Sequence, residues 1–255
     1  MPGTETQRTA EFRRITELES ESPTLIEGLP GHGLVASIAV DQITKQLQLE
    51  KHGVIQSEEF PPVATFSDGK VGDLVRVYAG EEPSIMTLQS DMALPPNAFD
   101  PLGDCVLNDL ADEFEKAVFL AGSPAQSEET VGTVRGVATT DGMKKKLEDA
   151  GIEIPEDRGI VGGITGSLVN DCYHADVPAA VLIVEANPYL PDPKAARSVV
   201  EEALEPLLGF DIDTSELVEQ AEEIQRQKQQ IAQQLKQRQA QGQTQEPSGG
   251  PGMYQ

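Results

Sequence analysis

The sequence predicts an α/β protein: a three-layer α/β/α domain around a mixed sheet, followed by a long C-terminal helix. Three observations support this fold class. Short apolar segments alternate with helical patterns between residues 24 and 209, as they do in α/β domains. Several segments, such as AVFLAG and AAVLIVEA, are almost continuously apolar, which is typical of central strands buried on both faces. The segment VGDLVRVYAG lies just before SIMTLQS and indicates a hairpin, so part of the sheet is expected to be antiparallel.

Strands are expected where Val and Ile gather and where Gly, Pro or Asp bounds the run. The segments that meet this description are residues 24–28, 53–60, 74–79, 84–89, 117–121, 132–139, 159–163 and 179–185.

Helices are expected between these strands, because apolar residues recur there at helical spacing. The first spans residues 33–47, and the second spans 96–116, where apolar residues lie four positions apart. The third begins at Asp141 as an N-cap residue and ends before Gly151, which suits the C′ position. The fourth spans residues 193–208 and completes the body of the protein.

A different pattern begins after Gly209. Apolar residues then recur at alternating steps of four and three, which is the core seam of a coiled coil. The seam consists of Leu217, Ala221, Ile224, Lys228, Ile231 and Leu235. Lys228 is a polar core position that can set register or partner number. We expect this helix to mediate self-association or to project from the body; the alternative is a surface helix that folds back on the body.

The sequence ends in Met253, Tyr254 and Gln255, after the stretch QGQTQEPSGGPG. We interpret this ending as a docking peptide on a flexible linker; the alternative is an accidental or tag-like end. The predicted organisation is therefore an N-terminal extension at 1–22, the α/β/α domain at 23–210, a Gln-rich heptad helix at 211–240 and a flexible tail at 241–255.

The chain is strongly acidic, with 43 Asp and Glu against 19 Lys and Arg and a net charge of −24. This charge repels nucleic acid and anionic membranes, and its even distribution is typical of the solvated surface of a halophilic protein. No apolar run approaches the length of a transmembrane helix, and the first residues lack a hydrophobic signal region. Cys105 and Cys172 form neither a Cys-x-x-Cys pair nor a zinc spacing. We therefore expect a soluble cytoplasmic protein.

Glycine-rich loops are the obvious candidates for a ligand site. Gly28, Gly31, His32 and Gly33 lie between a predicted strand and a predicted helix, but they match neither phosphate-binding glycine pattern. Gly163 and Gly166 form a second cluster, and Asn187 follows the last strand, where α/β sheets often bind ligands. An enzyme would use His32 as a base; the alternative is that these residues only allow tight turns. Three histidines in 255 residues argue against a His-rich metal site, and no cofactor is expected.

Four segments, taken together, resemble the archaeal proteasome assembly chaperone family. They are GLPGHGLVAS at 28–37, PPVATF at 61–66, GGITGSL at 162–168 and EANPYLPDP at 185–193. The resemblance implies an α/β/α body related in fold to nucleoside phosphorylases, without an established enzymatic activity. It also implies homo-oligomers that interact with the proteasome.

One archaeal branch of that family carries a C-terminal tail of a hydrophobic residue, a tyrosine and any residue, and resembles an ATP-independent activator of the proteasome core particle. In this sequence Met253, Tyr254 and Gln255 would take those three positions. The resemblance therefore implies docking on the α subunits of the core particle. The alternative is a phosphorylase-like enzyme, or a small-ligand-binding protein, that uses the glycine-rich loops.

Overall fold

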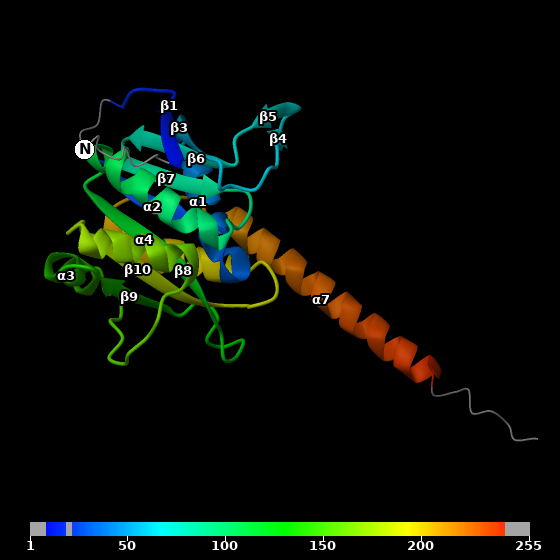
Figure 1. The fold of residues 1–255 in the computed structure, drawn as a ribbon. Coiled ribbons are helices and arrows are strands. Elements are labelled where there is room, and N and C mark those ends of the chain that lie inside the picture. Colours follow the sequence, from blue (N-terminus) through cyan, green and yellow to red (C-terminus); the bar gives the residue numbers. More distant parts are fainter. Residues whose placement is uncertain (1–8, 19–21, 243–255) are drawn as a thin grey trace, which may run out of the picture.

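The computed structural model describes residues 9–18 and 22–242, with side chains as far as Gln227 and at Gln230. The described chain forms one large mixed sheet of eight strands covered by helices (Figure 1). Its order is β1 (Ala10–Arg14), β3 (Glu50–Ser57), β6 (Val75–Glu81), β7 (Ser84–Ser90), β2 (Thr24–Gly28), β8 (Lys116–Pro124), β10 (Ala179–Ala186) and β9 (Val134–Ala138).

The centre of the sheet is parallel and its two sides are antiparallel. Strands β7, β2, β8 and β10 run in one direction. The pairs β1–β3, β3–β6, β6–β7 and β10–β9 are antiparallel. The predicted mixed sheet is therefore confirmed, and so is the hairpin, which pairs Val75 with Ser90 and Glu81 with Ser84.

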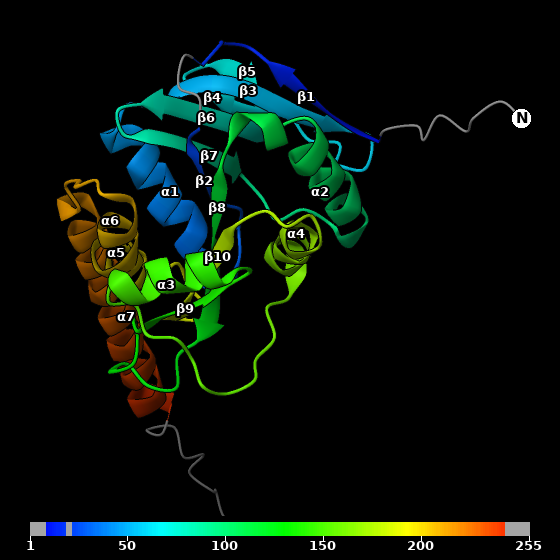
Figure 2. The ribbon, with the colours of Figure 1, turned by 90° about the vertical axis from the view of Figure 1, so that its left-hand side faces the viewer.

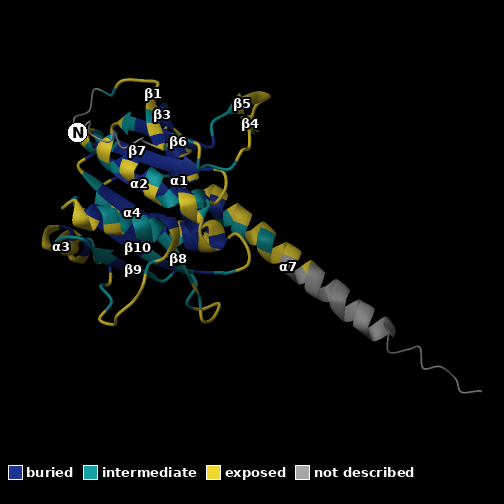
Figure 3. Cartoon of the chain, viewed as in Figure 1, coloured by how far each residue is buried: buried dark blue, intermediate teal, exposed yellow. Residues whose placement is uncertain are grey.

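Helices cover both faces of the sheet, which gives the predicted three layers (Figure 2). One face carries α1 (Val35–Gln46), α3 (Asp141–Asp149), α5 (Pro193–Val199), α6 (Glu205–Leu208) and the start of α7 (Ser215–Gly242). The other face carries α2 (Phe99–Asn108) and α4 (Gly163–His174). Each interface has its own hydrophobic core, and the central strands between them are buried on both faces (Figure 3).

Two predicted elements differ from the structure. Residues 159–163 are not a strand: Ile160 is 97% exposed, Val161 is half-buried, and α4 begins at Gly163. The helix expected over 96–116 is broken into a short 3-10 turn at Pro96–Ala98, helix α2 and a second turn at Ala111–Glu113. Helix α3 lies where it was predicted, but Thr140 caps it, accepting a hydrogen bond from the Met143 amide at 3.2 Å. Gly151 has a φ of +77° directly after this helix, as a C′ glycine should.

Three strands of the structure were not predicted from the sequence. Strand β1, within the segment interpreted as an extension, pairs with β3 at the edge of the sheet. Strands β4 (Thr65–Ser67) and β5 (Lys70–Gly72) form a separate two-stranded hairpin that projects from the body (Figure 1). None of the helices in the described residues is long and apolar enough to span a bilayer.

Helix α7 begins on the body and continues beyond it (Figure 1). Its first turns pack against α5, where Leu217 is 1% exposed and belongs to the hydrophobic core. Two hydrogen bonds tie its start to the body: Gln42 Nε2 donates to the Asp213 carbonyl at 2.7 Å, and Thr214 Oγ1 bonds Glu201 Oε1 at 2.5 Å. The helix therefore folds back on the body at its start and projects at its end.

Replacing Leu217 with Ala is expected to destabilise the protein by about 2–5 kcal/mol, because it removes a buried leucine from the contact between α7 and the core. Chemical denaturation would measure this loss. The control is Glu219→Ala, which truncates an exposed side chain on the same helix. Equal unfolding free energies for the two variants would show that Leu217 does not anchor α7.

Candidate functional site

The predicted ligand loops lie at one edge of the sheet. The parallel strands β7, β2, β8 and β10 all end there. The glycine-rich loop follows β2, Asn187 follows β10, and Thr165 at the start of α4 contacts the end of β2. The carboxyl ends of parallel strands are where open α/β sheets usually bind ligands, so this edge is the first place to look for a site.

The structure brings Gly33 and Asn187 together. A Cβ atom on Gly33 would come within 2.9 Å of the Ala186 Cβ and 3.1 Å of the Asn187 carbonyl oxygen. The Gly33 carbonyl accepts a hydrogen bond from the Asp192 amide at 2.8 Å. Gly33 also has a φ of +63°, a conformation that favours glycine. This glycine is thus required by a close approach of two loops.

The loop after β2 packs closely against the end of β8. A Cβ atom on Gly122, near the end of β8, would come within 2.3 Å of the His32 carbonyl oxygen. The His32 side chain points to solvent, and within the described residues no carboxylate bonds it. Gly31 is exposed, and a Cβ atom there would meet nothing within 4 Å. The arrangement provides a tightly packed turn and no oriented base.

Glu27 is a buried acid at this edge that the sequence analysis missed. It is fully buried, and its carboxylate joins three elements. Oε1 accepts from the Leu29 amide at 2.8 Å; Oε2 accepts from the Leu120 amide at 3.4 Å and from Thr165 Oγ1 at 3.4 Å. Burial raises the pKa of Glu27 to about 8, although these hydrogen bonds act in the opposite direction. The signal in the sequence is a single acid at the end of the apolar strand TLIEG.

The second glycine cluster is also explained by packing. Gly163 has a φ of +68° at the start of α4. A Cβ atom on Gly166 would come within 2.3 Å of the Val161 carbonyl oxygen. Thr165 lies between them and bonds Glu27. The cluster therefore allows α4 to begin close to the sheet, beside the buried carboxyl.

Replacing Glu27 with Gln is expected to flatten the dependence of stability on pH. The carboxyl ionises near 4.5 in an unfolded chain and near 8 in the folded protein, so the folded state keeps a proton that the unfolded state loses. The free energy of unfolding should therefore fall as pH rises from about 4.5 to about 8. Gln stays neutral, so denaturation at pH 5, 6, 7 and 8 should show a smaller loss in the variant. If the free energy of unfolding changed with pH by the same amount in both proteins, this role of Glu27 would be contradicted.

Asn187 shapes the loop that follows β10. Its Oδ1 accepts hydrogen bonds from the amides of Tyr189 at 2.9 Å and Leu190 at 3.1 Å. The backbone amide of Asn187 donates to Asp192 Oδ2 at 2.8 Å. Asp192 Oδ1 caps α5 by accepting a hydrogen bond from the Ala195 backbone amide at 3.1 Å. The result is a fixed loop that holds Tyr189 at 90% exposure.

An open hollow of about 660 Å³ lies between this loop, α5 and α7. We call it the α5–α7 hollow. Asn187 and the seam residues Leu217, Ala221 and Ile224 all line it, so the structure places together residues that the sequence analysis assigned to two different sites. Nothing in the sequence linked them, because the hollow depends on where α7 packs.

The remaining predicted site residues are less fully described. Lys228, Ile231 and Leu235 lie on α7, but their side chains are outside the described part of the chain. Met253, Tyr254 and Gln255 lie outside the described residues altogether. Within the residues that are described, no group of three His, Cys, Asp or Glu side chains has the arrangement of a metal site.

Comparison with known families agrees with this fold. A model of the PAC2 family matches residues 25–232. The chain belongs to the PAC2 family. Among curated proteins it is similar to the uncharacterized protein MJ0106 of Methanocaldococcus jannaschii, with 30% identity over 224 residues, 88% of this chain and 91% of that protein.

Solved structures of PAC2-like proteins share the architecture. PbaA of Pyrococcus furiosus, an archaeal homolog of proteasome-assembly chaperone, is 28% identical with a TM-score of 0.79, covering 91% of this chain and 96% of PbaA. PbaB of the same organism, an archaeal proteasome activator, has a TM-score of 0.79 at 20% identity, covering 88% of this chain and 99% of PbaB. The second likeness concerns the fold alone. The PAC2 family match includes the first turns of α7.

Proposed function

We propose that this PAC2-family protein is an ATP-independent proteasome-interacting protein, an assembly chaperone or activator, that docks on the α ring of the core particle. The likeness to PbaA over most of both chains supports a role with the proteasome. The docking element of the proposal is the tripeptide Met253, Tyr254 and Gln255, and its receptors are the α subunits.

The observation that carries the proposal is the projecting helix α7. Its 28 residues correspond to about 42 Å of helix, and its start is fixed to the body by Leu217 and the hydrogen bonds described above. Ten further residues, 243–252, precede Met253, and such a segment reaches at most about 35 Å. The tripeptide is thus able to contact a partner far from the body.

The protein acts as a homo-oligomer in this proposal. Leu217 is already buried in the core of its own chain, so it has no surface left for a partner helix. We therefore assign self-association along the seam to its later positions, Lys228, Ile231 and Leu235. These positions lie on the part of α7 that continues beyond the body (Figure 1). The phosphorylase-like alternative receives no support from the described loops, because close packing accounts for their glycines and no carboxylate in the described residues bonds His32.

A pull-down with purified core particle tests the proposal. Full-length protein should capture α subunits, whereas protein that lacks residues 253–255 should not. The matched control is Gln245→Ala, which changes the linker but leaves the tripeptide intact. Equal capture by the truncated and full-length proteins would contradict docking through the tail.

A further inference from the structure

The β4–β5 hairpin is a projecting element with its own turn. Asp68 and Gly69 have φ values of +50° and +74°, the combination found in a type I′ turn, which Asp-Gly strongly favours. The hairpin pairs Thr65 with Gly72 and Ser67 with Lys70, and it is not joined to the main sheet. Figure 1 shows it standing off the body.

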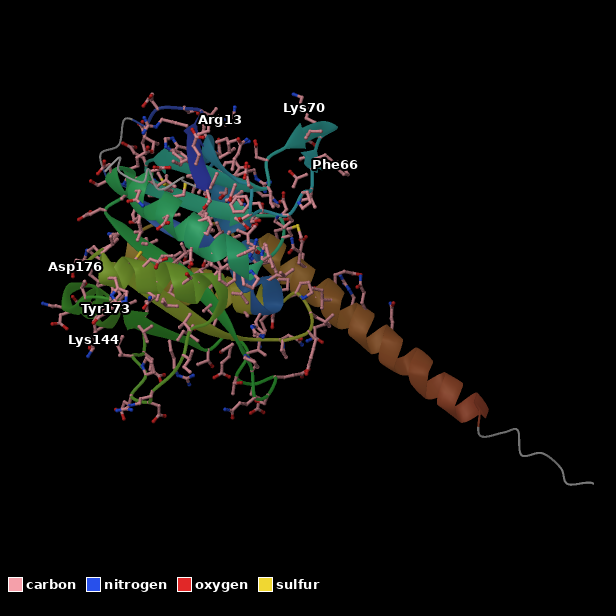
Figure 4. All side chains as sticks on the ribbon, in the orientation of Figure 1. Arg13, Phe66, Lys70, Lys144, Tyr173 and Asp176 are labelled. Atoms are coloured by element: carbon pink, nitrogen blue, oxygen red, sulfur yellow. The ribbon has the colours of Figure 1, made fainter. Side chains whose placement is uncertain are left out.

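The hairpin presents an uncovered apolar pair. Phe66 and Val71 lie directly opposite each other, and they are 81% and 80% exposed. An isolated two-stranded hairpin is marginal in water unless a face of it is packed, and exposed apolar groups that cluster in this way mark interaction sites. Phe66 and Lys70 both point away from the body (Figure 4), so the described part of the chain does not cover this face of the hairpin.

The α5–α7 hollow is a complementary surface on the same molecule. Its walls include the apolar side chains of Val131, Pro191, Val218 and Ile224. Exposed Glu222 on α7 also lines it. The lining includes the cations Lys194, Arg197 and Arg226, of which Arg197 and Arg226 pair with Glu201 and Glu223. The hairpin and the hollow lie at separate places in Figures 1 and 2, so one chain does not fill its own hollow.

We propose that the hairpin of one copy docks in the α5–α7 hollow of a second copy, with Phe66 and Val71 against its apolar walls. Two copies that each carry a charge of −24 repel each other, so their contact has to be apolar and to pair opposite charges. Lys70 at the hairpin tip and Glu222 at the hollow are exposed, and neither has an ion-pair partner within the described residues. They form the charge pair of the interface.

This contact joins two different surfaces, so it is heterologous. It produces a closed ring if the rotation from one copy to the next brings the last copy back to the first. It specifies one interface of the oligomer that the proposed function requires and adds to the contacts along α7. When two copies already touch at one of these interfaces, the effective concentration for forming the other interface is raised, so the two contacts strengthen each other.

Sedimentation equilibrium of the full-length protein tests the apolar part. The double variant Phe66→Asp with Val71→Asp should weaken self-association by about tenfold or more, because two large apolar side chains are lost from the interface. At concentrations where the unchanged protein is also monomeric, its thermal midpoint should stay unchanged, since both residues lie outside the two cores. The control Arg158→Asp changes the net charge by the same amount on another exposed loop, which does not line the hollow. Unchanged self-association of the double variant would overturn the proposal.

Cross-linking tests the orientation. Both native cysteines are buried, so Lys70→Cys and Glu222→Cys add single accessible thiols. Under oxidation a mixture of the two variants should give a linked dimer that neither variant gives alone. A dimer of Lys70→Cys alone would show hairpin-to-hairpin packing, and no dimer in the mixture would show that the hollow is not the receptor; either result overturns the proposal.

A charge swap tests the proposed ion pair between Lys70 and Glu222. Lys70→Glu and Glu222→Lys should each weaken self-association, and the combination should restore it. None of these measurements uses the proteasome, so failure here leaves tail docking standing, and failure of tail docking leaves this interface standing.

Discussion

Deletion of residues 253–255 is expected to abolish the stimulation of peptide hydrolysis by the proteasome core particle. We expect the apolar side chains of Met253 and Tyr254 to enter pockets between neighbouring α subunits, where each contributes about 1.5–3 kcal/mol if fully buried. Without them the body has no docking element in this account. Hydrolysis of a fluorogenic peptide by the core particle, with and without added protein, measures the effect.

The single variant Tyr254→Ala should lose nearly as much stimulation as the deletion, because tyrosine supplies the larger buried surface of the pair. Gln245→Ala, in the same segment, should stimulate like the unchanged protein. Stimulation that survives both the deletion and Tyr254→Ala would mean that the body or α7 makes the functional contact.

The second large effect is expected from the seam of α7. Two apolar side chains provide about 3–6 kcal/mol, whereas association costs about 4–15 kcal/mol, so one tail alone binds weakly. An oligomer that presents several tails gains by effective concentration. Replacing Ile231 and Leu235 with Asp should therefore dissociate the oligomer in sedimentation experiments and reduce the apparent affinity for the core particle by about a hundredfold or more.

The matched control carries the same added charge on the opposite side of the helix. Gln230→Asp with Gln233→Asp should leave both the oligomer and the affinity unchanged, because these positions lie off the seam. If the seam variant were monomeric and still bound the core particle with full affinity, the requirement for several tails would be wrong.

Most of the central sheet could be predicted from the sequence. Strands buried on both faces leave near-continuous apolar runs, and β2, β8 and β10 lie where those runs predicted them. The spacing of apolar residues also located α1 and α7. Where a segment is fixed by its own burial pattern, the sequence carries enough information to place it.

The misses have physical reasons. Strand β1 is held by its hydrogen bonds to β3, and in AEFRR only Ala10 is buried, so the strand leaves no apolar pattern. The segment at 159–163 contains Ile160 and Val161, but it joins neither sheet of the described chain and leads directly into α4. The hairpin at β4–β5 had a local signal in Asp68-Gly69, and its strands were too short to recognise.

The candidate sites were only partly predictable, because they depend on contacts between distant segments. Glu27 stands out only when the segments that carry Leu29, Leu120 and Thr165 are seen to meet. The α5–α7 hollow can be recognised only once it is known that Leu217 anchors α7 against the body. Sequence periodicity marked Leu217 as an apolar position, but it did not indicate that the first turns of α7 pack on the same chain.

The most direct test of the central claim is an electron cryomicroscopy structure of the full-length protein bound to the core particle. The account predicts density for Met253 and Tyr254 in the pockets between neighbouring α subunits, with more than one pocket filled and the bodies held away from the ring. A complex in which the bodies contact the ring while these pockets stay empty would contradict it.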